Sequence, residues 1–283
     1  MVADSRAPLP APGDANVPTS GDSRPIGVFD SGVGGLTVMR SLIDLLPAES
    51  FVYFGDTGRT PYGPKPPDDV LKFSIQIAEL LHARGVKVLV DACNTSTAVA
   101  LEVLRSRLNI PIVGVIEPGL RAAQRVTRSG RVGVIGTVGT IDSGAYARVA
   151  AEIAPEIELV SAACPGFVEF VEAGDTESHQ VHVLAERLLA PVIAADVDTL
   201  VLGCTHYPLL ARTIGDVMGP DVVLVSSADE TAFAVRGLLD DTSASRADAA
   251  THDFLTSGSP ARFAELGVQF LGPEVASVQG WQW

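Results

Sequence analysis

Short apolar runs alternate along this chain with longer stretches in which apolar residues recur every three or four positions. The runs PIGVFD (25–30), FVYFGD (51–56) and VKVLVDA (86–92) lack the polar alternation of a half-exposed strand, which is typical of strands buried on both faces. LTVMRSLIDLLP (36–47) and a stretch that ends near Gly85 have helical spacing. Strands of this kind separated by helices predict an α/β fold with a mainly parallel sheet.

The pattern occurs twice. GVFDSGVG (27–34) is echoed by GVIGTVGT (133–140), and VKVLVDACNT (86–95) is echoed by VDTLVLGCTH (197–206), at similar intervals. An internal echo of this length indicates a repeated structural unit. We therefore expect two similar parallel-sheet α/β domains that face each other across a cleft, related by a pseudo-twofold axis. Polar residues at the carboxyl ends of the strands should line that cleft.

Composition fits a folded chain of two domains. Of 283 residues, 47% are hydrophobic and 19% are charged, which supplies ample apolar surface for a core. The formal net charge of −14 would repel phosphate backbones and anionic lipid, so we expect neither nucleic acid nor membrane as a partner. Three cysteines without paired spacing indicate a reducing compartment, and we expect a cytoplasmic protein.

The first 24 residues differ from the rest of the chain. They carry four prolines among small and polar residues, and they lack the continuous apolar core of a signal peptide. We expect residues 1–24 to form a disordered tail, with the folded part beginning at Pro25.

Cys93 and Cys204 are the candidate reactive groups. Free cysteine is commonly buried as a small hydrophobe, so a structural role is the first alternative. A metal site is not expected, because no CxxC or HxxxH pair accompanies either residue. However, each follows an apolar run where a helix should begin, and helix N-termini can lower a thiol pKa from about 8.5. The two also occupy equivalent places in the echo, whereas Cys164 lies outside it and is expected in the core.

Two thiols that face each other across a cleft suit one kind of chemistry. One thiolate can remove a proton from one face of a carbon while the other thiol delivers a proton to the opposite face, which inverts the centre. A nucleophilic hydrolase would instead need one cysteine with a histidine and no second thiol.

Other polar segments allow two interpretations each. SGVGGLT (31–37) lacks the spacing of a dinucleotide loop or a P-loop, so a tight turn into a helix is expected. DTGRTPYGPK (56–65) is either a rigid surface turn or a loop that reaches a ligand through Tyr62. His206 is either a satisfied polar side chain or a group that shares a proton with Cys204. Glu172 could be an ordinary solvated helix residue.

Six motifs together resemble the signatures of glutamate racemases in the aspartate/glutamate racemase family, from about Pro25 to the carboxyl end. In order they are GVFDSGVGGLTV, GDTGRTPYG, ACNTSTA, GVIEPG, GVIGTVGT and LGCTHYPLL. The resemblance implies an isomerase that interconverts L- and D-glutamate without a cofactor or metal and supplies D-glutamate for peptidoglycan, and hence for cell wall biogenesis and cell shape. Two alternatives remain open: racemisation of aspartate or another small substrate, and a non-catalytic two-domain protein that binds a small ligand.

The resemblance also assigns residues. It implies that Cys93 abstracts the proton of D-glutamate and Cys204 that of L-glutamate. The residues that it implies tune or assist the thiols are Asp30, Glu172, His206 and Thr137. The substrate-binding positions that it implies are Asp30, Ser31, Tyr62, Gly63, Asn94, Thr95, Thr205 and His206.

The family fold implies a discontinuous first domain, residues 25–116 plus 227–283, and a second domain, residues 117–226. A homodimer is expected. Two positions depart from the family pattern, because Asp91 stands where an apolar residue is usual and Ser96 where alanine is common. A carboxylate at position 91 points to the opposite face of a regular strand, yet it would raise the pKa of the Cys93 thiol.

Overall fold

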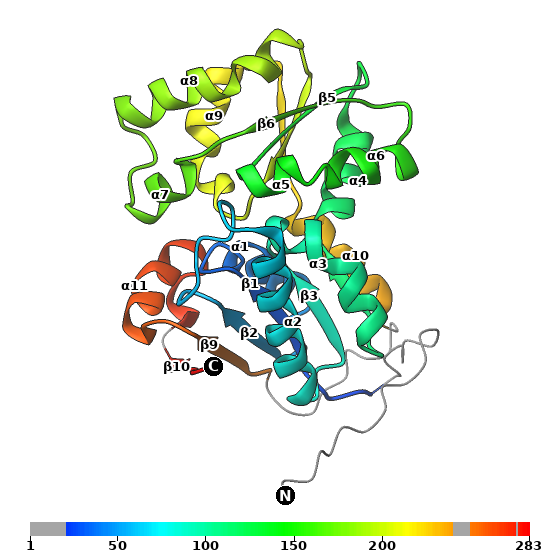
Figure 1. Cartoon of the computed structure of the whole chain (residues 1–283), viewed down its shortest axis with the longest axis vertical. Coiled ribbons are helices and arrows are strands. Elements are labelled where there is room, and N and C mark those ends of the chain that lie inside the picture. The colour runs from blue at the N-terminus through cyan, green and yellow to red at the C-terminus, as the bar shows by residue number, and fades with distance from the viewer. Residues whose placement is uncertain (1–20, 240–249, 276) are drawn as a thin grey trace, which may run out of the picture.

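The computed structural model describes residues 21–239, 250–275 and 277–283. The predicted tail, residues 1–24, lies outside the described residues except for its last four positions. The chain forms two lobes, one above the other in Figure 1, and each lobe is built on its own sheet. No helix in the described ranges is long and apolar enough to cross a membrane.

The first lobe, lobe A, contains a six-stranded sheet in the order β10-β9-β2-β1-β3-β4. All of its strand pairs are parallel. The central strands β1, β2 and β3 are buried along their whole length, as predicted for strands covered on both faces. The strands are β1 (Ile26–Asp30), β2 (Phe51–Gly55), β3 (Val88–Asp91), β4 (Ile112–Gly114), β9 (His252–Thr256) and β10 (Val278–Gly280).

The second lobe, lobe B, contains a four-stranded parallel sheet in the order β6-β5-β7-β8. Its strands are β5 (Arg131–Gly136), β6 (Glu158–Ala163), β7 (Thr199–Gly203) and β8 (Val223–Ser226). The order matches β2-β1-β3-β4 in lobe A, and the echoed segments supply the equivalent strands β1 and β5, then β3 and β7. The prediction of two parallel-sheet α/β domains is confirmed, and the pseudo-twofold relation is consistent with this order.

Helices cover both sheets (Figure 1). The α-helices are α1 (Leu36–Leu45), α2 (Pro67–Ala83), α3 (Asn94–Arg107), α4 (Ile116–Val126), α5 (Val138–Asp142), α6 (Ala145–Ile153), α7 (Phe167–Glu172), α8 (His179–Ala194), α9 (Ala211–Met218), α10 (Ala228–Leu238) and α11 (Pro260–Phe270). Two 3₁₀ turns are η1 (Tyr207–Leu210) and η2 (Pro273–Val275).

The chain passes between the lobes twice. It leaves sheet A after β4 and enters α4, which packs on β7 and α6 of lobe B. It leaves sheet B after β8 and enters α10, which packs on α1 of lobe A. We propose that the two domains divide at these crossings, between residues 116 and 117 and between 226 and 227.

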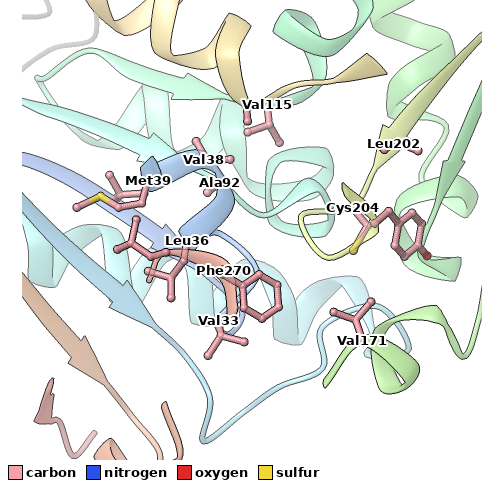
Figure 2. Packing of buried hydrophobic residues seen from close by; sticks show 14 of the residues in the cluster. Val33, Leu36, Val38, Met39, Ala92, Val115, Val171, Leu202, Cys204 and Phe270 are labelled. Atoms are coloured by element: carbon pink, nitrogen blue, oxygen red, sulfur yellow. The ribbon is translucent and has the colours of Figure 1, made fainter. Parts of the chain in front are cut away.

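The two lobes share one hydrophobic cluster. Val33, Leu36 and Phe270 of lobe A belong to the same cluster as Val171 and Cys204 of lobe B. Figure 2 shows these side chains gathered where the lobes meet. The contact between the lobes therefore has an apolar component beside the polar strand ends.

A buried ion pair lies within lobe A. Lys87 Nζ is 2.7 Å from Glu49 Oε2, and both side chains are almost fully buried. Lys87 also donates from Nζ to the Asp22 carbonyl at 2.8 Å and from its backbone N–H to the Pro25 carbonyl at 2.9 Å. Lys87 thereby attaches residues 22–25 to the start of β3.

Removal of one partner of this pair should destabilise the fold strongly. Lys87→Met leaves the Glu49 carboxylate buried without its cation, and we expect a loss of about 3–5 kcal/mol in the free energy of unfolding, measured with urea. Lys87→Met combined with Glu49→Leu should recover most of that loss. Arg212→Met is the matched control, because it breaks the exposed Arg212–Glu177 pair and should cost less than about 1 kcal/mol. Equal losses for Lys87→Met and Arg212→Met would contradict this account of the buried pair.

Candidate active site

Candidate site residues from both lobes lie at the carboxyl ends of equivalent strands. In lobe A, Asp30 is the last residue of β1 and Cys93 follows β3 by two residues. In lobe B, Thr137 follows β5 directly and Cys204 follows β7 directly. Parallel strands end at one edge of a sheet, so each lobe presents one cysteine and one further polar group at that edge.

Both cysteines line one pocket between the lobes. Its cavity volume is about 20 Å³, which is room for about one water molecule. A larger ligand can enter only after the lobes or the lining side chains move. The pocket is lined by Ser31, Thr60, Pro61, Tyr62, Gly63, Cys93, Asn94, Thr95, Thr137, Val168, Cys204, Thr205 and His206.

Ten of the twelve predicted site residues are in this lining, together with three that were not predicted, Thr60, Pro61 and Val168. The other two predicted residues, Asp30 and Glu172, contact the lining from behind. Asp30 lies within hydrogen-bonding distance of Thr205, and Glu172 pairs with His206.

Cys93 occupies the N-cap position of α3 and is 5% exposed. Burial raises the pKa of its thiol, and the nearby carboxyl groups of Asp30 and then Asp91 act in the same direction. The Ser96 N–H and the Ser31 hydroxyl act in the opposite direction but do not compensate. The expected lowering by the helix N-terminus is present through the Ser96 N–H, but burial and two carboxyl groups outweigh it, so the pKa of Cys93 is raised.

Cys204 is followed by the 3₁₀ turn η1 and not by an α-helix, since α9 begins only at Ala211. The Tyr207 N–H donates to the Cys204 carbonyl at 3.1 Å, which is the spacing of a 3₁₀ turn. Pro208 has no N–H to donate to the Cys204 carbonyl four residues earlier, so an α-helical turn cannot be completed there, and this explains the difference from the prediction. The His206 ring lies beside the Cys204 thiol, with Sγ 4.0 Å from Nδ1.

His206 carries a positive charge beside Cys204. Its Nε2 is 3.1 Å from Glu172 Oε1, and the ring is almost fully buried. Burial by itself lowers the pKa of His206, but hydrogen bonds with Cys204 and Glu172 and electrostatic interactions with Cys204 and Asp30 raise it to about 10. At neutral pH an imidazolium therefore lies next to Cys204, whereas carboxyl groups lie next to Cys93.

Asp30 connects the two lobes. It is fully buried, and its Oδ2 accepts the Gly32 N–H at 2.8 Å. The Thr205 hydroxyl of lobe B donates to Oδ1 at 3.4 Å. Burial raises the pKa of Asp30, while the nearby His206 charge and these donors act to lower it.

Glycines bring the lobes close together. A Cβ at Gly34 would lie 2.4 Å from both His206 Nδ1 and Thr205 Oγ1, so no other residue fits there without movement. A Cβ at Gly63 would lie 2.7 Å from Thr137 Cβ. The Gly139 N–H donates to the Gly63 carbonyl at 2.9 Å, which joins the lobes through their backbones. The segment 31–37 is the predicted tight turn into a helix, and the structure adds this second reason for its glycine at position 34.

Hydroxyl and amide groups from the two lobes meet at the pocket. Thr95 Oγ1 is 2.9 Å from Thr137 Oγ1 and 3.1 Å from Thr140 Oγ1. The Tyr146 hydroxyl donates to Asn94 Oδ1 at 2.7 Å. Because Asn94 uses its oxygen for this bond, its NH₂ group is the part that can donate to a ligand. Sequence reasoning missed Thr140, which ends the echoed segment, and Tyr146, for which the sequence holds no signal.

Tyr62 is held by a carboxylate that sequence reasoning also missed. Its hydroxyl donates to Asp56, which is fully buried. Asp56 also accepts from Arg59 Nε at 2.7 Å and from the Ser257 hydroxyl at 2.5 Å. The segment 56–65 is thus a fixed loop that lines the pocket, and in this structure the phenol of Tyr62 binds Asp56.

Cys164 is buried, as predicted, and does not line this pocket; its carbonyl accepts the Tyr207 hydroxyl at 3.1 Å. Burial raises the pKa of its thiol to about 12. Within residues 21–239, 250–275 and 277–283, no group of three or more His, Cys, Asp and Glu side chains is arranged to hold a metal ion.

Comparisons with known proteins agree with this geometry. Residues 26–235 match the model of the Asp/Glu/hydantoin racemase family. A glutamate racemase from Geobacter metallireducens is 51% identical over 255 residues, which cover 89% of this chain and 94% of the relative. The crystal structure of a glutamate racemase isoform, RacE1, from Bacillus anthracis is 42% identical with a TM-score of 0.86, covering 92% of this chain and 97% of that one.

A second solved structure, the glutamate racemase from Francisella tularensis in complex with D-glutamate, is 34% identical with a TM-score of 0.86 and covers 92% of this chain and 98% of that one. The family match spans most of the chain, and the matched relatives are covered over nearly their full length. This chain belongs to the Asp/Glu/hydantoin racemase family, and it is an isomerase that acts as an amino-acid racemase.

Proposed function

We propose that this chain racemises glutamate by a two-base mechanism that uses Cys93 and Cys204 and no cofactor. The observation that carries the proposal is that these two thiols, from equivalent strand ends of two lobes, line one pocket. Binding alone would not need a cysteine from each lobe. A reaction that removes a proton on one side of a carbon and adds one on the other does need two such groups.

The reaction proceeds in two directions through the same carbanion-like transition state. From D-glutamate, the Cys93 thiolate takes the α-proton while the Cys204 thiol gives its proton to the opposite face of the carbon. This produces L-glutamate, a Cys93 thiol and a Cys204 thiolate. From L-glutamate the roles are reversed, so each turnover leaves the protons arranged for the opposite enantiomer.

Donors around the pocket would hold the substrate and stabilise the charge that develops on it. The hydroxyls of Ser31, Thr95 and Thr205 and the NH₂ group of Asn94 are suited to the two carboxylates. Preorganised donors of this kind stabilise the negative charge that grows as the α-proton leaves.

The two thiols have unequal surroundings. The raised pKa of Cys93 favours the thiol form there. The His206 imidazolium, held by Glu172, favours negative charge at the Cys204 end of the pocket. We infer that Cys93 holds its proton in the free protein, which prepares the pocket for L-glutamate.

The names of the relatives support glutamate as the substrate. The Geobacter and Bacillus proteins are glutamate racemases, and the Francisella structure contains D-glutamate. We further propose that the product D-glutamate serves peptidoglycan synthesis, that the protein is cytoplasmic and that it is a homodimer.

A substrate panel tests the choice of glutamate. Chiral chromatography of glutamate, aspartate and a hydantoin after incubation with the protein should show inversion of glutamate at the highest rate. These three compounds are chosen because the description of the family names all three substrate classes. Faster inversion of aspartate or a hydantoin would assign the site to that substrate.

The two-base assignment is tested by replacing each cysteine separately. Cys93→Ala and Cys204→Ala should each lose racemisation by roughly 10²–10⁴-fold, because each lacks one acid/base group. In deuterated water, Cys204→Ala should still exchange the α-proton of D-glutamate, and Cys93→Ala that of L-glutamate, as read by mass spectrometry. Cys164→Ala is the control and should keep full activity. Native racemisation rates in either single variant would show that the assignment is wrong.

The charge on His206 is tested with Glu172→Gln. NMR titration of the His206 ring should give a midpoint near 10 in the native protein. The variant should titrate at lower pH, because a neutral amide stabilises the imidazolium less than a carboxylate does. Glu169→Gln, an exposed position on the same helix, is the matched control and should leave the midpoint unchanged.

The same pKa fixes the direction of a stability effect. The folded pKa of about 10 lies above the ordinary value for histidine. The protonated ring therefore stabilises the fold fully below about pH 6.5, and this contribution is lost as the pH rises through 10. The free energy of unfolding, measured with urea, should decline as the pH rises over this range, and the decline should be smaller in Glu172→Gln. An equal decline in both proteins would contradict the role of Glu172.

A further inference from the structure

Asp91 is a buried acid behind Cys93. It is the last residue of β3 and is fully buried. Its Oδ1 accepts the Cys93 N–H at 3.2 Å. In the described part of the chain, the titratable groups that act on it are Asp30 and Cys93, both of which are acids, and no ion pair includes it. An ionised Asp91 would thus be a buried charge without a cation, which is costly.

The other carboxyl oxygen of Asp91 starts a chain of short contacts. Asp91 Oδ2 is 2.7 Å from Ser96 Oγ on α3. Ser96 Oγ is 2.7 Å from Ser74 Oγ on α2. Ser74 Oγ is 2.7 Å from the Val70 carbonyl oxygen. All four residues are buried, so the contacts are made away from solvent.

Counting protons along this chain fixes the state of the acid. An oxygen–oxygen contact of this length is a hydrogen bond, and each one requires a proton. The Val70 carbonyl can only accept, so the Ser74 hydroxyl donates its single proton there. Ser74 must then accept from Ser96, which uses the single proton of Ser96. The third contact can have a proton only if Asp91 supplies it.

We infer that Asp91 is a neutral carboxylic acid and a positioning residue for Cys93. Its protonated oxygen donates to Ser96, and its carbonyl oxygen accepts the Cys93 N–H. The backbone of Cys93 is thereby fixed between β3 and α3 without a negative charge beside the thiol. The importance of this for catalysis rests on the proposed function, but the protonation state of Asp91 does not.

An ionised Asp91 would leave this series of hydrogen bonds one proton short. If Asp91 were a carboxylate, two hydroxyl protons would have to serve three contacts, and one pair of buried oxygens would face each other without a proton. Such a pair costs free energy in a dry interior. Burial also raises the pKa of Asp91, and it outweighs the hydrogen bonds with Ser96, Cys93 and Thr97 that lower it, in agreement with the neutral form.

Infrared difference spectroscopy of the full chain tests the inference directly. At about pH 7.5, far above the ordinary aspartate pKa of about 3.9, the native spectrum minus that of Asp91→Asn should contain a carboxylic-acid C=O band. Ser96→Ala should shift that band to higher frequency, because the acid loses the acceptor of its proton. A difference spectrum with carboxylate bands and no acid band would overturn the inference.

Kinetics test the positioning role. Asparagine can donate from its NH₂ group to Ser96 and accept the Cys93 N–H, so Asp91→Asn should keep kcat/KM and its pH profile almost unchanged. Asp91→Leu can do neither, and kcat/KM should fall roughly tenfold to a hundredfold, since small misplacements of reacting groups have effects of that size. A displaced pH profile in Asp91→Asn would contradict a neutral acid at this position.

A failure of the proposed function and a failure of the inference about Asp91 would give different results. If the native protein did not racemise glutamate, the proposed function would be wrong, while the infrared band would still decide the state of Asp91. If the native protein is active and the acid band is absent, only the inference about Asp91 is wrong.

Discussion

The close approach of the two lobes at their glycine loops is the constraint on which the site depends. Gly34 leaves no space for a Cβ against Thr205 and His206, and Gly63 leaves little against Thr137. A larger side chain at either point would require the lobes or the facing side chains to move. The same approach allows bonds such as Gly139 N–H to Gly63 O, at 2.9 Å, to form between lobes. It also reduces the pocket to about 20 Å³, so a substrate can enter only after the lobes or the lining side chains move.

Within that closed pocket, similar strand ends carry different charges. The echo places a cysteine after β3 and another after β7, yet His206 and Glu172 accompany one and Asp30 and Asp91 the other. A racemase must handle both enantiomers, but its two acid/base groups need not be equivalent when the pocket is empty. The His206 imidazolium places a positive charge at the Cys204 end of the pocket, and a neutral Asp91 limits the penalty on forming a thiolate at Cys93. The repeated backbone thus places the two thiols, and the side chains around each thiol determine which of them keeps its proton.

Much of the fold and the identity of the two site cysteines could be predicted from the sequence, because the signals were local or repeated. Continuous apolar runs predicted the buried strands, and the second copy of the cysteine segment distinguished Cys93 and Cys204 from Cys164. The errors arose where the outcome depended on surroundings. A helix start predicted a lowered pKa for Cys93, but burial and nearby carboxyls raise it. Asp56, Thr140 and Tyr146 were missed because their partners come from other elements, as when Tyr146 of α6 binds Asn94 of α3.

The central claim is that the two thiols act on opposite faces of one carbon. A crystal structure of the native protein with bound glutamate tests it most directly, through the distance between the two sulfur atoms and their positions relative to Cα. The account predicts one sulfur on each face, each about 3–3.5 Å from Cα, and the sulfurs therefore roughly 6–8 Å apart. Both sulfurs on one face, or a substrate carbon in contact with only one of them, would contradict the two-base account.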